Sequence, residues 1–399
     1  MPNLHKLPKL TILVLLLLAP LVTASAQDDE ERHRAFQLFK DAKYPEAQAL
    51  FEKLAVAHPQ DAAVIENLGL LVFHQSTYLP TAEERKKARK RARDLLIQAV
   101  QLGSPNPLSA MIDGIPADGG NDETFSTRKE VDDAMHEGEA AFGKGEFPKA
   151  IEMYQRALLL DPKLYEAALF IGDVYFKSAE QIKAGEWFAR AIEINPDRET
   201  AYRYWGDSLM KQGKVTEAGD KFVEAYIAEP YHRLARAGFV NWGERVNISL
   251  AHPRVEFPAS VAQKGENQTT ITLDPKMFDK GDKDGSSGAW MIYSLTRASW
   301  ATSEFAKQYP DEKAYRHSLK EEATAIRAAL KSLNEKKAAN VDRSLEILKK
   351  LDKEGLLEPF ILLAIPDAGI AGDFAAYRKT NTENLRRYVK QYVMTGGGQ

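Results

Sequence analysis

Residues 165–198 read YEAALFIGDVYFKSAEQIKAGEWFARAIEINPDR and make up one unit of a sequence repeat. Small residues and a proline stand at four fixed points of this stretch, namely Gly172, Ala184, Ala191 and Pro196. The same four residue types recur with a period of 34, upstream at Gly138, Ala150, Ala157 and Pro162, and downstream at Gly206, Ala218, Ala225 and Pro230. Helices that cross closely need small side chains, and proline ends a helix. The period therefore predicts an all-α fold of stacked helix–turn–helix units, which suits a binding protein better than an enzyme.

The repeat resembles the tetratricopeptide repeat, whose pattern is W-x2-L-G-x2-Y, then A-x3-F, then A and P. Its aromatic positions are filled by Tyr154 in residues 131–164, by Tyr175 and Phe188 in residues 165–198, and by Trp205 and Phe222 in residues 199–232. The resemblance implies a superhelix of paired helices that binds a partner in its groove.

A weaker version of the pattern lies upstream. Residues 28–61 carry Leu38, Ala47, Phe51 and Pro59 at the expected places, and Leu68-Gly69 begins a second unit. The second half of that unit is displaced toward the C-terminus, where Ala92, Leu96 and Ala99 restore the pattern. We therefore predict a second repeat with an insertion near residues 76–88, between its two helices.

The rest of the chain divides by composition. We predict a signal peptide at 1–26, an N-terminal block of two weak repeats at 27–104, a linker rich in proline and glycine at 105–130, three repeats with a capping helix at 131–245, short strands and a loop at 246–288, and a C-terminal helical domain at 289–399. The strands are expected because apolar residues alternate at Val246, Ile248 and Leu250, at Val255 and Phe257, and at Thr269, Ile271 and Leu273.

The N-terminus has the features of a secretory signal. Lys6 and Lys9 precede an apolar run at 11–22, and Ala24-Ser25-Ala26 forms a small-x-small cleavage site. The run is shorter than the roughly 20 residues that a membrane span needs. We expect cleavage after Ala26 and a periplasmic or secreted bacterial protein.

Charge and cysteine content exclude several classes. The chain has no cysteine, so it has no disulfide and no cysteine-based zinc site. Without Lys6 and Lys9, 52 basic residues stand against 57 acidic ones, a net charge of −5. This mild charge argues against a nucleic-acid partner. We interpret the basic run Arg85–Arg93 as a solvated helix face, whose opposite side has Ala88, Ala92, Leu95 and Leu96 for the core.

The resemblance places positions 2, 5, 9, 12 and 13 of each repeat in the groove. The predicted partner-binding residues are Met135, Glu139, Phe142, Leu169, Asp173, Phe176, Lys177, Arg203, Asp207, Met210 and Lys211, with Phe39 and Phe73 at position 12 of the weaker repeats. This acidic and apolar surface suits a protein or peptide with basic and apolar side chains. The alternative is that these residue types are simply common at these positions. The family's clamp for terminal carboxylates is disfavoured, because position 9 is acidic in all three repeats.

A second candidate site lies in the C-terminal domain. Four residues have helical spacing, namely Trp290, Tyr293, Arg297 and Trp300. They form either a binding site for carbohydrate, peptide or lipid, or a helix face that packs in the core. We favour the core face. His317 and Glu321 are four positions apart and are expected to share one helix face. Together they are too few for zinc.

No metal, cofactor or catalytic motif is expected. The loop from Asp279 to Gly285 fails as an EF-hand, because Lys280 and Met291 would fall at ligand positions 1 and 12. The chain also has no H-E-x-x-H, G-x-S-x-G or Walker motif.

The favoured function is therefore a scaffold or adaptor of the bacterial cell envelope that binds a partner segment in the groove. One alternative is that the C-terminal helical domain is a ligand-binding or hydrolytic module recruited by the repeats. Another is that the solenoid self-associates. The sequence leaves open the oligomeric state, the continuity of the two repeat blocks, and whether residues 105–130 occupy the groove.

Overall fold

The computed structural model describes residues 19–120, 124–263, 269–278, 285–333 and 341–396. These residues are mostly helical and include one two-stranded sheet, which confirms the all-α class with a short β segment. The chain divides into two compact units, Met1–Ala179 and Glu180–Gln399. Each unit is described by itself.

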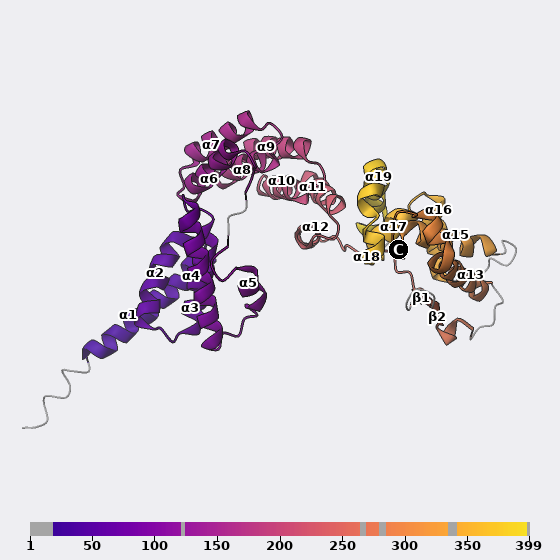
Figure 1. Ribbon diagram of the computed structural model, residues 1–399, viewed down its shortest axis with the longest axis horizontal. Helices are drawn as coiled ribbons and strands as arrows, with labels where there is room; N and C mark the ends of the chain where they lie inside the picture. Colours follow the sequence, from indigo (N-terminus) through magenta and orange to yellow (C-terminus); the bar gives the residue numbers. More distant parts are fainter. Residues whose placement is uncertain (1–18, 121–123, 264–268, 279–284, 334–340, 397–399) are drawn as a thin grey trace, which may run out of the picture. The chain divides into compact units, whose positions relative to one another are not determined.

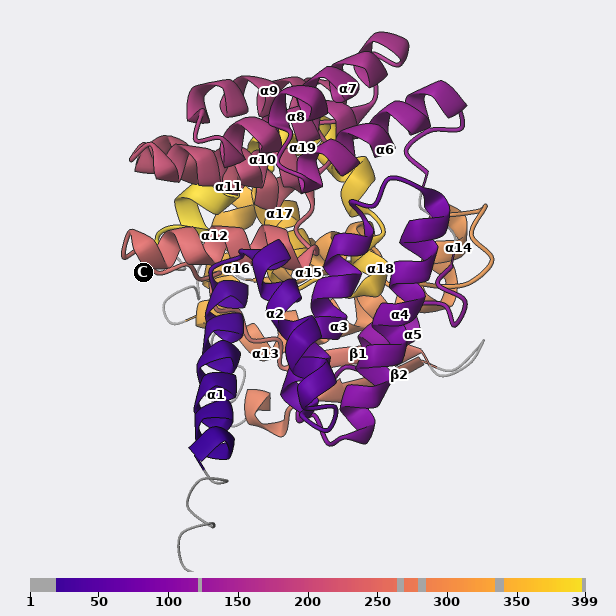
Figure 2. The same ribbon diagram turned by 90° about the vertical axis from the view of Figure 1, so that its left-hand side faces the viewer.

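The first unit is a row of helical hairpins (Figure 1). Its helices are α1 (Ala19–Lys40), α2 (Tyr44–Ala57), α3 (Ala62–Ser76), α4 (Ala82–Gln101), α5 (Ser109–Gly114), α6 (Lys129–Gly143), α7 (Phe147–Leu160) and α8 (Tyr165–Lys177). Helices α1 to α4 lie side by side, each packed on the next (Figure 2).

The glycine and alanine of the repeat stand where two helices of a hairpin meet. A Cβ atom on Gly138 of α6 would lie 2.4 Å from Cε1 of Tyr154 on α7. Ala150 and Ala157 are fully buried on the same helix. The repeat pattern is therefore a pattern of close approach between helices, as the sequence predicted.

Helix α4 differs from the other second helices of the first unit. It has 20 residues, whereas α2 and α7 have 14 each. Thr81 caps its first turn: the Thr81 hydroxyl accepts from the Glu84 amide, and the Glu84 carboxylate accepts from the Thr81 amide. The extra residues near 76–88 thus lie in a short loop and in the first turns of a longer helix.

The basic run of α4 is a solvated face only in part. Lys87, Lys90 and Arg91 are exposed, and Ala92 and Leu96 are buried, as the sequence predicted, whereas three arginines bind the surrounding chain. Arg85 is 5% exposed and donates to the Leu79 carbonyl. Arg89 Nε donates to the Gly119 carbonyl at 2.7 Å, and Arg93 Nε donates to the Ile115 carbonyl at 2.9 Å. The linker lies on α4 because these side chains bind backbone carbonyls that its irregular chain leaves unpaired.

The second unit begins with the end of the repeats and continues to the C-terminus. Its elements are α9 (Gln181–Ile194), α10 (Glu199–Lys211), α11 (Val215–Ala228), α12 (Arg233–Arg245), β1 (Ala259–Gln263), β2 (Thr269–Leu273), η1 (Pro275–Phe278), α13 (Ser286–Ser299), η2 (Trp300–Glu304), α14 (Phe305–Gln308), α15 (Leu319–Ser332), α16 (Arg343–Lys353), α17 (Leu357–Ala364), α18 (Ala368–Ala371), α19 (Phe374–Tyr388) and η4 (Val389–Val393).

The described residues of the second unit include one two-stranded β-sheet. Strands β1 and β2 are antiparallel, with Ala259 opposite Leu273. The strands predicted at 246–250 and 255–257 are not formed. Pro253 and Pro258 lack the amide hydrogens that a ladder needs, and the alternating apolar side chains of this stretch pack against the helical core instead.

The repeats and the C-terminal helices of this unit share one hydrophobic core. Phe222, Phe239 and Trp242 from the repeat end belong to the same buried cluster as Tyr388 and Phe360. Helix α19 packs on α11, where Arg386 pairs with Glu224 at 2.5 Å. The C-terminal helices are therefore an extension of the repeat core.

The predicted signal peptide falls mainly on residues 1–18, which lie outside the described residues. Within the described part of the chain, no helix has both the length and the apolar character needed to cross a membrane.

Candidate functional site

The predicted groove residues of the first unit have very different exposures. Met135 and Leu169 are buried, at 0% and 5% exposure, so they support the hairpins and are not available to a partner. Phe142 and Phe176 are half-buried, and Lys177 is exposed. Position 12 of the repeat, rather than position 5, is therefore the one that meets solvent in this unit.

Glu139 lies at position 9 and is only 8% exposed. Tyr154 donates its hydroxyl proton to Glu139 Oε1 at 2.6 Å, from α7 to α6. Burial raises the pKa of Glu139 to about 7, with a further contribution from the negative charge of Asp173 on α8, although the Tyr154 hydrogen bond opposes the shift. A carboxyl group that titrates near neutrality thus lies beside a second acidic side chain.

Six rings that keep contact with solvent form an aromatic series along the first unit. The series runs through Phe39, Tyr44, His74, Tyr78, Phe142 and Phe147, with successive ring centroids 5.8, 4.6, 5.6, 6.0 and 5.9 Å apart. It follows the turns between the paired helices and crosses from the first repeat block to the second at Tyr78 and Phe142. The two blocks thus contact each other through aromatic rings.

Only Phe39 and Phe142 of this series were predicted from the sequence. Tyr44, His74, Tyr78 and Phe147 were not predicted, and Phe73, which was, has a partly buried side chain that packs against the core of α1 to α4. A sequence signal was available. Tyr44-Pro45 and Phe147-Pro148 are equivalent dipeptides at the start of two second helices, where proline is well tolerated.

The predicted groove residues of the second unit lie on α10. Arg203 forms two hydrogen bonds to the buried carboxylate of Glu199, at 2.8 and 3.1 Å, so its charge is already paired. Met210 packs against the core of the unit, whereas Asp207 and Lys211 are exposed. Of these four residues, Asp207 and Lys211 are the two that a partner can reach.

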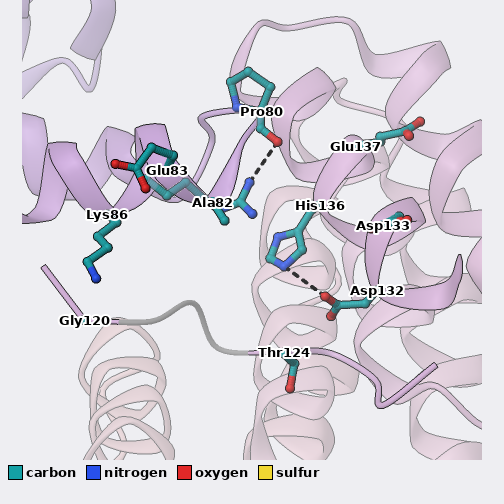
Figure 3. Close-up of a pocket in the computed structure, with 11 residues that line it drawn as sticks. Pro80, Ala82, Glu83, Lys86, Gly120, Thr124, Asp132, Asp133, His136 and Glu137 are labelled. Carbon is teal, nitrogen blue, oxygen red and sulfur yellow. Dashed lines mark hydrogen bonds and ion pairs between the residues drawn. The ribbon is translucent and has the colours of Figure 1, made fainter. Parts of the chain in front are cut away.

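A pocket of about 630 Å³ lies between the start of α4 and the start of α6 (Figure 3). Glu83 and Lys86 line it from α4, and Asp133, His136 and Glu137 line it from α6. The imidazole of His136 faces the carboxylate of Asp132, with Nε2 3.5 Å from Oδ2 (Figure 3). The facing surfaces are charged, so the two helices cannot form the dry contact of neighbouring repeats.

The second predicted site is a buried face. Trp290, Tyr293, Arg297 and Trp300 are exposed by 2%, 2%, 9% and 6%. Tyr293 donates to Glu322 at 2.8 Å, and Arg297 Nε lies 3.2 Å from Glu321 Oε1. These side chains form a core face, which was the favoured prediction, and not an exposed binding surface.

His317 and Glu321 do not share a helix face, so that prediction was wrong. His317 precedes Ser318, the residue that caps α15, and its ring turns back toward Glu322 and Asp367. Tyr315 is the residue that contacts Glu321 from this segment, at 2.9 Å. Sequence spacing failed here because the helix begins only at Leu319, beyond His317 and its cap.

In the described residues, no group of three or more histidine, aspartate or glutamate side chains is arranged to hold a metal ion. The acidic loop beginning at Asp279 lies largely outside the described residues.

Comparison with known proteins supports the repeat assignment. Residues 136–199 match the family model of the tetratricopeptide repeat. The match falls within the part of the chain where the 34-residue pattern is clearest. No curated protein matches the sequence.

Several solved structures are similar to parts of the chain. They include the first TPR of Spaghetti (RPAP3) bound to an HSP90 peptide, with 18% identity, coverage of 30% of this chain and 97% of that one, and a TM-score of 0.28. The Sgt2 TPR domain from Aspergillus fumigatus has 21% identity, coverage of 32% and 85%, and a TM-score of 0.29. MamA has 20% identity, coverage of 51% and 92%, and a TM-score of 0.25.

Proposed function

We propose that this protein is a protein-interaction scaffold that binds a segment of a partner protein on the first unit, next to the aromatic series. The single observation that carries the proposal is the position of the rings. Large aromatic side chains from successive hairpins, Phe39, Tyr78 and Phe142 among them, remain half-exposed. Aromatic side chains that keep solvent contact are the usual anchors of protein interfaces.

The charge of α6 supports a basic partner segment. Outside the core, this helix carries four acidic residues, Glu130, Asp132, Asp133 and Glu137, against one lysine, Lys129. A partner with basic and apolar side chains would complement both the helix and the rings. We therefore expect the affinity to fall as salt concentration rises.

The first experiment compares two double variants of the full chain. Phe142→Ala with Phe176→Ala removes two half-exposed rings, and Val56→Ala with Leu159→Ala removes two apolar side chains that are 84% and 83% exposed on α2 and α7. An extract of the source organism is passed over each protein, and circular dichroism checks that both variants are folded. We expect the ring variant alone to lose a specific partner.

A crosslinking experiment tests the same surface without removing the rings. A photoreactive residue is placed at Lys177, which is exposed beside Phe176, and, as a control, at Leu159. The proposal predicts that one defined protein is crosslinked from Lys177. Equal crosslinking from both positions would place the interaction elsewhere.

We also propose that the protein is exported and acts in the bacterial envelope or outside the cell. The proposal rests on the basic start, the apolar run and the Ala24-Ser25-Ala26 site. N-terminal sequencing of the protein from its native source tests it, with Gln27 expected as the first residue. A chain that retains Met1 would contradict export by cleavage.

A further inference from the structure

Both ring nitrogens of His317 face carboxylates. Nδ1 lies 2.7 Å from Asp367 Oδ2, and Nε2 lies 2.9 Å from Glu322 Oε2. An ionised carboxylate only accepts hydrogen bonds, and a neutral imidazole has only one N–H. Both contacts are therefore hydrogen bonds only while the ring carries two protons.

These two contacts join three helices that are separate in sequence. Asp367 caps α18 by accepting the Ile370 amide at 2.8 Å, and Glu322 of α15 accepts the Tyr293 hydroxyl of α13. The backbones are also in contact, because a Cβ on Gly369 would lie 2.2 Å from the His317 carbonyl oxygen. The ring of His317 thus links α18 to the α13–α15 pair.

The charges around the ring depend on its second proton. Arg297 of α13 lies 3.2 Å from Glu321 and 3.4 Å from Glu322. With His317 charged, this ring and Arg297 both face Glu322, and the ring also faces Asp367. With His317 neutral, Arg297 remains beside Glu321 and Glu322, and Asp367 loses the positive charge of the ring it contacts.

The remaining charged and titratable groups at this place are paired with one another. Arg316 binds Glu312 and Asp373 at 2.9 and 2.7 Å and also donates to the Gly369 carbonyl of α18 at 2.8 Å, and Tyr315 donates to Glu321. Asp373 also accepts the Leu319 amide at 2.8 Å. These contacts give no second cation that would replace the charge of His317 between Glu322 and Asp367.

We propose that His317 is a pH-sensitive bridge, which fastens α18 to α13 and α15 while the ring is doubly protonated. When the ring loses a proton, this attachment is released, and α18 is held more loosely, through the bond from Arg316 to Gly369. Burial by itself would lower the pKa of His317, but the hydrogen bond to Glu322 and its negative charge raise that pKa above the ordinary value of 6.5. A histidine with a raised folded pKa stabilises the fold fully below its unfolded pKa, and the contribution is lost as pH rises through the folded value. The release is therefore expected at a pH above 6.5.

The test uses the full-length chain labelled with nitrogen-15 in histidine, titrated from about pH 6 to about pH 9. The His317 ring should lose its proton above 6.5. Over the same range, hydrogen exchange of the Ile370 amide, corrected for its intrinsic pH dependence, should lose protection by at most about tenfold per pH unit. A ring that titrates at or below 6.5, or Ile370 protection that is constant through the titration, would overturn the proposal.

Two variants separate the bridge from general loss of structure. Asp367→Asn keeps a cap for α18 but removes one carboxylate charge, so release should move to lower pH. His317→Gln should abolish the pH-dependent step at Ile370. His58→Gln is the matched control, because His58 pairs with Asp28 on the exposed surface of the first unit, and it should leave the step unchanged. A step that persists in the folded His317→Gln variant would assign it to another group.

Discussion

The side chain of Tyr78 lies against the backbone of Gly143. A Cβ atom on Gly143 would be 2.3 Å from Cβ of Tyr78 and 2.7 Å from its Cγ. Tyr78 follows α3 in the first repeat block, and Gly143 is the last residue of α6 in the second. This contact, together with the ring of Phe142, joins the two blocks within the first unit.

We predict that Gly143→Ala destabilises the protein by about 1–3 kcal/mol. The new methyl group would overlap Cβ of Tyr78, and rotation of the Tyr78 side chain does not move that atom. Urea denaturation of the full chain measures the change. Gly114→Ala is the control, since a Cβ there meets no atom within 4 Å. If Gly143→Ala were as stable as Gly114→Ala, Tyr78 would not be closely packed on Gly143.

The arginines of α4 give a second prediction. Arg89→Ala removes hydrogen bonds to the carbonyls of Gly119 and Gly120, and Arg93→Ala removes the one to Ile115. Hydrogen bonds from a charged donor contribute about 1.5–3 kcal/mol each, so segment 115–120 should loosen in either variant.

Hydrogen exchange measured by mass spectrometry should show faster exchange in residues 115–120 and little change in α6 and α7. Lys87→Ala is the matched control, because Lys87 is an exposed cation of the same run. Unchanged exchange in both arginine variants would mean that the linker holds its place without α4.

The shared core of the second unit gives a third prediction. His252 Nδ1 lies 2.8 Å from the hydroxyl of Tyr388, and Nε2 lies 3.4 Å from that of Tyr226, so this ring connects α19 to α11. A fragment of residues 246–399 would expose the cluster around Tyr388 to water. We expect it to aggregate or to unfold without cooperativity, whereas residues 180–399 should unfold cooperatively in a thermal scan. A soluble, cooperative 246–399 fragment would show that these helices are an independent domain.

The repeat was predictable because its residues are fixed by local geometry. Gly138 faces Tyr154 within one hairpin, so the spacing along the chain records the contact directly. The same holds for Gly206 and Phe222 in the second unit. Such contacts leave a period in the sequence that a reader can count.

The candidate site was less predictable because its contacts cross between hairpins. Tyr78 meets Phe142, and His317 meets Asp367, across long stretches of chain with no period that links either pair. The contacts of Arg89 and Arg93 with the linker were not predictable for a related reason, since their partners are backbone carbonyls, which no residue type marks. The difference lies in whether a contact is made within one repeated hairpin or between segments that occur once.

Glu139 gives the last prediction, because its burial opposes its charge. Its folded pKa of about 7 stands above the ordinary value of 4.5, so the folded protein binds the proton more tightly than the unfolded chain does. An acid of this kind stabilises the fold below its unfolded pKa, and that contribution is lost as pH rises from about 4.5 to about 7; at one unit per about 1.4 kcal/mol, the loss is about 3 kcal/mol.

Glu139→Gln tests this, because the amide keeps an oxygen that accepts from Tyr154 and removes the charge. The variant should be more stable than the parent at about pH 8 by up to about 3 kcal/mol, and nearly equal to it at about pH 5, when both are measured by urea denaturation. Asp133→Asn on the same helix is the control, because Asp133 is exposed and pairs with Lys129 on the surface. If Glu139→Gln gained stability and lost the partner, the carboxylate would be retained for binding at the expense of stability. If it gained neither stability nor any change in binding, Glu139 would be ionised at little cost in the folded protein, and its role next to Asp173 would have to be reconsidered.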